Sequence, residues 1–302
     1  MKPADLINEI KTLKEKRNAI IMAHNYQLDE VQEIADFTGD SFELSKKATS
    51  ESAGTIVFCG VHFMAESAYI LSPEKTVLLP DPQAGCPLAD TITPEALMAR
   101  KEEYPEAAVV CYINSPASVK ALSDICCTSS NAVRVVNSLE AKQVLFVPDK
   151  NLAAFVAGQS DKEIIPWEGC CVTHDSVSVD DVTKARANYP DGVIIVHPEC
   201  RPEVTAMADH IGSTTEIIRF AAETKAKKIV IGTEMGTLYK LTKTSPDKEF
   251  YLLSTSLICP TMKLITRKKI KNALETMHPQ ITVPEEVRKA ASTALDRMLQ
   301  IQ

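Results

Sequence analysis

Three cysteines recur along this chain of 302 residues at a nearly constant spacing. Cys86, Cys171 and Cys259 are 85 and 88 residues apart, and polar side chains around them recur in step. A free cysteine often serves only as a small buried residue, but thiolates are also strong ligands for zinc and iron. Because each copy of the repeat contributes one cysteine, we expect the three thiolates to share one metal site.

The same repeat is visible in the segments that must position these cysteines. His24, Tyr112 and His197 each follow an apolar run rich in β-branched residues, and a second apolar run ends 34 residues later in every copy. The segments ADFTGDSFEL, LSDICCTSSN and MADHIGSTTE align without gaps on Asp36, Asp124 and Asp209. A period of this length suits three small domains better than a solenoid of short repeats.

Each copy alternates short apolar runs with helical patterns. In the first copy the expected strands are 19–23, 55–58 and 76–79, and the expected helices are 29–37, 41–49, 64–71 and 94–104. Apolar runs of four or five residues between helices indicate buried parallel strands. The fold class is therefore α/β, and we expect three compact lobes with small parallel sheets.

Proline-containing stretches mark candidate boundaries between the copies. Pro105 and Pro190 occupy matching places, and we divide the chain into 1–105, 106–190 and 191–302. The third unit includes a C-terminal helix, 285–301, which has no counterpart in the other copies and is expected, with helix 4–16, to close the ends of the assembly. A repeat fixes the spacing between copies but not the residue at which one lobe ends and the next begins. Terminal elements of one copy can therefore pack on a neighbouring lobe.

The composition excludes several classes of partner. The net charge is −7, and no basic stripe interleaved with aromatic residues is present, which argues against nucleic acid. The basic cluster between Arg267 and Lys271 is expected to be the solvated face of one helix. No signal peptide or membrane-spanning apolar run is found, so we expect a cytoplasmic protein. In a reducing compartment, nine cysteines favour metal binding or catalysis over disulfides.

The repeated polar residues fall at the expected carboxyl ends of strands, where parallel sheets bind ligands. Three pairs follow the first strand of each copy: His24 and Tyr26, Tyr112 and Asn114, and His197 and Glu199. Three doublets begin a helix: Asp40-Ser41, Thr128-Ser129 and Ser213-Thr214. Each Ser or Thr there is first of all an N-cap. Brought together, the three helix starts would also offer hydroxyl and N–H groups to a carboxylate or phosphate.

The cysteines alone leave two metals open. Zinc on three cysteines takes a fourth ligand, which His174 could supply, whereas a 4Fe-4S cluster on three cysteines leaves one iron open. Cys170 is the nearest rival ligand but is out of register. The remaining cysteines are expected to be packing residues: Cys59, Cys111, Cys126, Cys127 and Cys200.

The motifs of this chain resemble those of the quinolinate synthase family, enzymes of de novo NAD biosynthesis. Six motifs carry the resemblance, in the family's order between about residues 19 and 275: AHNYQ with ADFTGDS, PDPQAGCPLAD, CYINSPASVKALSDICCTSSNAV, WEGCCVTHD, VHPEC with IGSTTEI, and IGTEMG. The resemblance implies three homologous αβα lobes in a pseudo-threefold arrangement around a central active-site cavity. It further implies a 4Fe-4S cluster on Cys86, Cys171 and Cys259. The CxxCxxC segment that some members carry near the C-terminus is absent here, which excludes a disulfide switch at that place.

The resemblance also implies the reaction and the residues that serve it. The enzyme would be a transferase that condenses iminoaspartate with dihydroxyacetone phosphate, giving quinolinate, phosphate and water. The implied active-site residues are His24, Tyr26, Ser41, Tyr112, Asn114, Ser129, His174, His197, Glu199, Ser213 and Thr214. A functional partner would be the oxidase or dehydrogenase that produces iminoaspartate.

Individual roles follow as hypotheses. Glu199 and Tyr26 would move protons, and Tyr112 and His24 would position or polarise the triose. The remaining polar residues, His197 included, would bind carboxylates and phosphate. His62, His210 and His278 are taken as structural, and Glu234 is undecided.

Two other functions remain open from the residues. A different 4Fe-4S hydro-lyase would use the same three cysteines without releasing phosphate. A metabolite-binding or metal-storage protein would instead hold zinc on these cysteines and His174.

Overall fold

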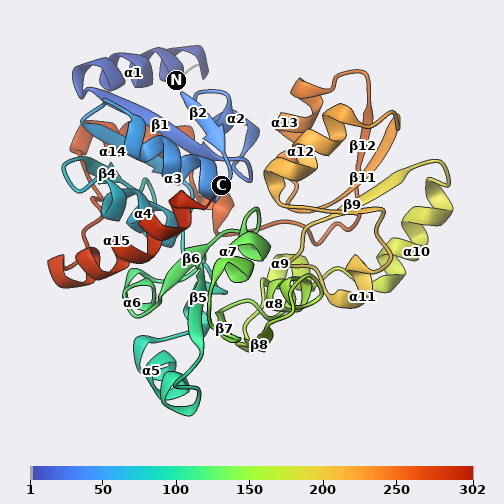
Figure 1. Cartoon of the computed structure of the whole chain (residues 1–302). Coiled ribbons are helices and arrows are strands. Elements are labelled where there is room, and N and C mark those ends of the chain that lie inside the picture. The colour runs from blue at the N-terminus through green and yellow to red at the C-terminus, as the bar shows by residue number, and fades with distance from the viewer. Residues whose placement is uncertain (1–2, 302) are drawn as a thin grey trace.

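Three small parallel sheets form the framework of the molecule, for which a computed structural model describes residues 3–301 (Figure 1). Each sheet has four strands, in the order β2-β1-β3-β4, β6-β5-β7-β8 and β10-β9-β11-β12, and every strand pair is parallel. The strands are β1 Ala19–His24, β2 Phe37–Gly39, β3 Thr55–Cys59, β4 Thr76–Leu78, β5 Ala108–Tyr112, β6 Ile125–Cys127, β7 Gln143–Val147, β8 Glu163–Pro166, β9 Val193–Val196, β10 His210–Ile211, β11 Lys228–Gly232 and β12 Glu249–Leu252. The expected α/β class and the three homologous lobes are confirmed.

Helices connect the strands and cover the sheets. Their bounds are α1 Pro3–Lys16, α2 Asp29–Gln32, α3 Ser41–Ser50, α4 His62–Leu71, α5 Pro94–Glu103, α6 Ala117–Lys120, α7 Ala132–Ser138, α8 Lys150–Ala157, α9 Val172–Asp175, α10 Val179–Asn188, α11 Pro202–Thr205, α12 Thr214–Glu223, α13 Thr237–Thr244, α14 Arg267–Thr276 and α15 Glu285–Gln300, with 3₁₀ turns η1 Ala89–Thr91 and η2 Met262–Leu264. Within residues 3–301, no helix has both the length and the apolar character that crossing a membrane requires.

The first expected helix pair is wrong in one respect. Helix 29–37 stops at Gln32, and residues 37–39 form strand β2 at the edge of the first sheet. The cause is Asp36, whose backbone N–H donates to the carbonyl of Ile21 at 2.9 Å while its carboxylate accepts the Ile21 N–H at 2.7 Å. This two-way bridge holds the chain extended beside β1.

The other two lobes repeat this bridge. The carboxylates of Asp124 and Asp209 accept the N–H groups of Val109 and Ile194, each at 2.7 Å. The aspartate on which the repeats align is therefore a structural residue that attaches an edge strand, and each lobe has one strand more than the sequence predicts.

The last helix of each copy packs on the following lobe. Helix α5 packs against α6 of the second lobe, α10 against α11 of the third, and α14 against α1 and β3 of the first. The predicted boundaries after residues 105 and 190 lie in the connections that leave α5 and α10. These boundaries stay a prediction.

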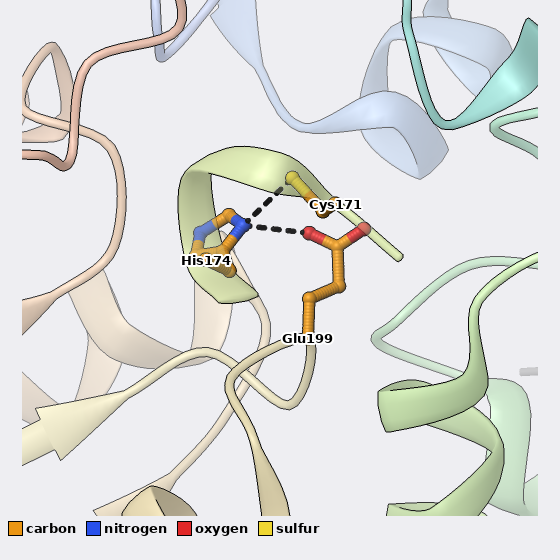
Figure 2. A group of neighbouring side chains, drawn as sticks. All are labelled: Cys171, His174 and Glu199. Atoms are coloured by element: carbon orange, nitrogen blue, oxygen red, sulfur yellow. Dashed lines mark hydrogen bonds and ion pairs between the residues drawn. The ribbon is translucent and has the colours of Figure 1, made fainter. Parts of the chain in front are cut away.

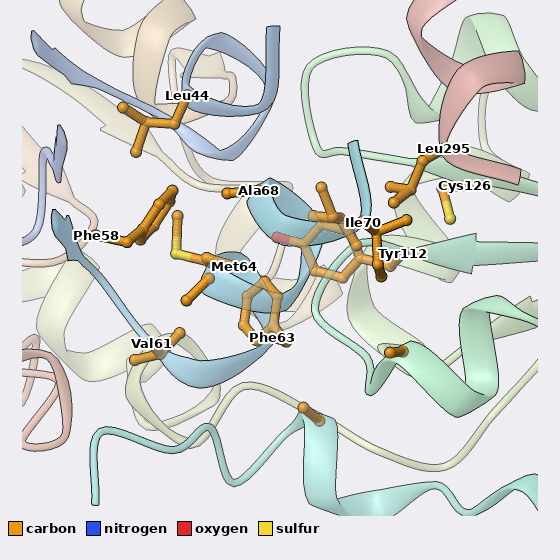
Figure 3. Close-up of a cluster of buried hydrophobic side chains, with 14 of the residues drawn as sticks. Leu44, Phe58, Val61, Phe63, Met64, Ala68, Ile70, Tyr112, Cys126 and Leu295 are labelled. Carbon is orange, nitrogen blue, oxygen red and sulfur yellow. The ribbon is translucent and has the colours of Figure 1, made fainter. Parts of the chain in front are cut away.

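Helix α15 joins the first two lobes, whereas α1 packs on α14 and β1. Helix α15 packs against α4, α6 and β6, and Leu295 on this helix lies in one core with Ile70 and Tyr112 (Figure 3). The Lys120 side chain is wholly buried in this region and donates to the Ser67 hydroxyl at 3.0 Å and the Ser115 carbonyl at 2.7 Å. The first two lobes and the C-terminal segment thus share one core, whereas the third lobe has two smaller cores of its own.

The basic cluster on α14 is not simply a solvated face. Arg267 is nearly buried, pairs with Glu33 and donates to the carbonyl of Glu30 at 2.7 Å. Lys269 pairs with Asp81, so these cations attach α14 to the first lobe. The charges of Arg267 and Lys269 are therefore paired within the protein.

Candidate functional site

The carboxyl ends of the three sheets open onto one cavity. Side chains from all three lobes line it. Those that the sequence singled out are His24, Tyr26, Ser41, Cys86, Tyr112, Asn114, Ser129, Cys171, His174, His197, Glu199, Thr214 and Cys259. The repeat register therefore brings together every candidate except Ser213.

Ser213 instead begins helix α12. Its hydroxyl oxygen accepts the N–H of Glu216, whose carboxylate accepts the Ser213 N–H at 2.8 Å, a reciprocal capping box. Asp40 caps α3 in the same way through Glu43. In these two doublets the second residue, Ser41 or Thr214, lines the cavity. Ser213 is an N-cap that positions Thr214.

The three cysteines come from loops that follow the last strand of each sheet. Burial raises the pKa of Cys86 to about 12, and it raises the pKa of Cys171 well above its usual range, with the Glu199 carboxylate adding to the shift at Cys171. With protein groups alone the thiols of Cys86 and Cys171 stay protonated, whereas a bound metal would ionise them. Cys170, next to Cys171, does not line the cavity. The five expected packing cysteines are all buried.

His24 ends strand β1 and is buried as a neutral imidazole. Burial lowers its pKa to about 3, helped by the nearby Lys263 ammonium and His197. Its Nδ1 accepts the backbone N–H of Tyr26 at 3.1 Å. The neutral ring therefore carries its proton on Nε2, which makes that nitrogen a donor.

Glu199 is the charged centre of the cavity wall. Its Oε2 lies 2.9 Å from His174 Nδ1 and 3.2 Å from His197 Nδ1. Burial alone would raise the pKa of Glu199, but the two histidines outweigh burial and lower it. Its other oxygen, Oε1, has no hydrogen-bond partner within residues 3–301, so the ionised carboxylate keeps one free acceptor.

A chain of hydrogen bonds joins Tyr26 to Glu199 across the lobes. The Tyr26 hydroxyl lies 2.8 Å from the Thr233 hydroxyl, which lies 2.9 Å from His174 Nε2. His174 then contacts Glu199 through its other nitrogen, Nδ1 (Figure 2). Thr214 also donates to the Tyr26 hydroxyl at 2.9 Å. The arrangement is a continuous path along which protons can move between the first and third lobes.

Tyr112 and Asn114 form the wall that the second lobe contributes. Burial and the Glu199 carboxylate raise the pKa of Tyr112 well above its usual range, so its hydroxyl is a donor at neutral pH. The buried Oδ1 of Asn114 has no partner within the described chain. Such an unsatisfied group in a cavity is suited to binding a polar ligand.

Some residues of the site were not found from the sequence. Thr233 was missed, and Glu234, left undecided, lines the cavity and pairs with Lys263 at 2.9 Å. Both belong to the motif IGTEMG that was noted for its resemblance. His62, His210 and His278 do not line the cavity.

One compact group could hold a single metal ion. Cys171, His174 and Glu199 offer ligand atoms within 4.8 Å of one another, and no other set of three His, Cys, Asp or Glu side chains does so in the described part of the chain (Figure 2). The sulfur atoms of Cys86, Cys171 and Cys259 therefore do not all lie within 4.8 Å of one another. Sulfurs on one tetrahedral zinc would lie only about 3.8 Å apart.

Known proteins resemble this chain over nearly its whole length. The family model described as quinolinate synthetase A protein matches residues 8–300. The quinolinate synthase of Caldicellulosiruptor bescii is 55% identical over 297 residues, covering 98% of both chains. That of Methanosarcina barkeri is 54% identical over 302 residues, covering 100% of this chain and 99% of the relative. Together with the shared cavity, these matches establish that the chain belongs to the quinolinate synthase family.

Proposed function

We propose that the protein is a quinolinate synthase that acts in NAD biosynthesis. One iminoaspartate and one dihydroxyacetone phosphate combine, and quinolinate, one phosphate and two waters leave. The observation that carries this proposal is the cavity itself, where one cysteine from each lobe faces the same space as His24, Tyr26, Tyr112 and Glu199. An asymmetric set of acids, bases and amides suits a reaction between two unlike substrates.

The three cysteines fit a 4Fe-4S cluster. Each is a free thiol that lines the cavity, and their sulfurs do not all lie within 4.8 Å of one another, which argues against one shared zinc ion. Such a cluster on Cys86, Cys171 and Cys259 would supply an open iron that acts as a Lewis acid toward a substrate oxygen. A fourth cysteine is not needed, because the vacant coordination position is the useful one.

The side chains of the cavity suggest the proton transfers. Glu199 is ionised and keeps Oε1 free, which suits a general base. Tyr26, at the other end of the path through Thr233 and His174, would return a proton to a departing hydroxyl. His24 presents Nε2–H and Tyr112 its hydroxyl, so both suit the polarisation of the triose carbonyl.

The anionic groups of the substrates would be bound by the helix starts. Ser41 and Thr214 occupy the first position of α3 and α12, where N–H groups and the helix dipole favour anions. Asn114, Ser129 and His197 complete this set. Iminoaspartate would reach the cavity from a partner oxidase or dehydrogenase.

Anaerobic purification with metal analysis tests the cofactor. The expected result is a brown protein with about four irons and four sulfides, which loses its colour on substitution of Cys86, Cys171 or Cys259 by Ala but keeps it in Cys170→Ala. A colourless protein with one zinc per chain, even after anaerobic reconstitution, would favour a site on Cys171, His174 and Glu199 and overturn the cluster.

The substrates are tested separately. Quinolinate and phosphate should appear together when iminoaspartate and dihydroxyacetone phosphate are supplied to the reconstituted protein. Dehydration of hydroxy acids without phosphate release would instead identify a hydro-lyase.

A further inference from the structure

One backbone hydrogen bond attaches each cysteine loop to its own lobe. In each lobe the donor is the backbone N–H of the residue four positions after the second apolar run, and the acceptor is the carbonyl two positions before the cysteine. The register is the same in all three copies. The three bonds are His62 N–H to the Ala84 carbonyl at 2.8 Å, Lys150 N–H to the Gly169 carbonyl at 2.8 Å, and Met235 N–H to the Leu257 carbonyl at 2.9 Å. The repeat thus conserves how the loop is held as well as the cysteine.

The residue before each of these donors differs between lobes. It is Val61 in the first lobe, Asp149 in the second and Glu234 in the third, each three residues after the matching apolar run. Asp149 Oδ2 accepts the backbone N–H of Cys171 at 2.9 Å, and Glu234 Oε1 accepts that of Cys259 at 3.1 Å. The side chain of Val61 has no acceptor, so Cys86 cannot be held in this way.

Both carboxylates are wholly buried and use both oxygens. The second oxygen of Asp149, Oδ1, accepts the Leu152 N–H at 2.7 Å and caps α8. Glu234 Oε2 accepts the Gly236 N–H at 2.7 Å. Capping uses only one oxygen of Asp149, so it does not account for the oxygen directed at Cys171. Glu234 Oε1 accepts the Cys259 N–H and also pairs with Lys263 at 2.9 Å. Burying a carboxylate costs free energy unless its oxygens accept hydrogen bonds. The bond to the cysteine N–H is therefore one of the contacts that stabilise each buried carboxylate.

We propose that Asp149 and Glu234 are positioning residues that fix Cys171 and Cys259 for metal binding, whereas in the described chain no side chain accepts the N–H of Cys86. Outer groups that orient a metal ligand are commonly as important as the ligand's own geometry. The identity of the bound group rests on the proposed function. The hydrogen bonds that attach the cysteine loops to Asp149 and Glu234 do not depend on it.

The substitutions Asp149→Asn and Glu234→Gln test the proposal. Each amide keeps the shape of the carboxylate but replaces one acceptor oxygen with an NH₂ donor, so it cannot accept both N–H groups. Asp181→Asn is the matched control, because Asp181 accepts the Ser178 N–H at 2.9 Å at the start of α10 and touches no cysteine loop. Lys263→Met controls for loss of the Glu234 ion pair.

Hydrogen–deuterium exchange of the metal-free protein reports the loops directly. We expect exchange to rise roughly tenfold or more in the segment around Cys171 in Asp149→Asn and around Cys259 in Glu234→Gln. Segments around Cys86 should keep their wild-type rates, as should all cysteine loops in Asp181→Asn. Unchanged exchange at both cysteine loops would overturn the proposal, whatever the protein binds.

Iron release to a chelator then measures the consequence for the cofactor. Both amide variants should lose iron roughly tenfold faster or more than the wild type, Asp181→Asn and Lys263→Met. Faster loop exchange with wild-type iron release would show that the carboxylates stabilise the loops without serving the metal, and would overturn the positioning role. If the wild type itself holds no iron, the proposed cofactor fails while the exchange result stands by itself. If one variant does not fold, the other lobe's variant decides.

Discussion

The hydroxyl of Tyr26, on the first lobe, lies 2.8 Å from the hydroxyl of Thr233, on the third. Thr233 is wholly buried, and its hydroxyl also contacts His174 Nε2. This single hydroxyl therefore connects Tyr26 to His174 and, through His174, to Glu199. The path between the two proposed proton carriers is complete only when the two lobes are closed on each other.

Replacing Thr233 with Val should interrupt this path. The shape stays nearly the same, but Tyr26 and His174 lose their common partner. We expect kcat to fall about 10- to 100-fold with little change in KM and no loss of cluster absorbance. Thr237→Val is the control, because Thr237 is equally buried and its hydroxyl has no partner among the described residues. Equal activity in the two variants would remove Thr233 from the proton path.

Glu199→Gln should abolish the general base while keeping the cavity filled. The amide has almost the same shape, so the cluster spectrum and substrate binding should survive, whereas turnover should fall about 10²- to 10⁴-fold. Glu203→Gln, an exposed glutamate on α11, provides the matched control. Near-normal turnover in Glu199→Gln would show that another group accepts the proton.

The sequence could predict which residues share the cavity, because most of them occupy matching positions of the repeat. Residues at equal register on equal folds must meet around the common axis, and Tyr112 and His197 line the same cavity for this reason. Their chemical roles stay predictions. Thr233 could not be found in this way, because its counterparts in the other copies are Gly60 and Pro148, which lack a polar side chain.

Other features could not be predicted from the sequence, for different physical reasons. Strand β10 has only two residues, too few for any periodic pattern, and its pairing depends on Asp209 reaching Ile194. A cap and a ligand-binding hydroxyl both place a Ser or Thr at a helix start, so the sequence alone did not separate Ser213 from Thr214, which lines the cavity. The capping box with Glu216 shows that Ser213 caps α12, and its part in ligand binding stays a prediction.

Acid should destabilise the protein in part through His24. Its pKa is about 3 in the folded protein and near 6.5 when unfolded, so the unfolded chain binds the extra proton first. Stability from this group is complete above pH ~6.5 and is lost as the pH falls toward 3, by at most about 1.4 kcal/mol per pH unit. Urea unfolding of the wild type and His24→Gln checks this, because the advantage of the wild type should shrink between pH 7 and 5. An advantage that grows on acidification would contradict the buried neutral imidazole.

Gly236→Ala should separate the first lobe from the third. A Cβ at this position would lie 2.6 Å from the carbonyl carbon of Tyr26 and 2.7 Å from its oxygen, and this backbone cannot yield as a flexible side chain would. Relief requires the Tyr26 loop to move, which lengthens the contact of its hydroxyl with Thr233. We expect a loss of about 1–3 kcal/mol in unfolding free energy and a fall in kcat that exceeds any change at Gly158→Ala. At Gly158 the nearest atom would be 3.6 Å away, an ordinary contact. Thermal unfolding and steady-state kinetics of both variants measure these effects, and equal behaviour would mean that the two lobes need not approach this closely for turnover.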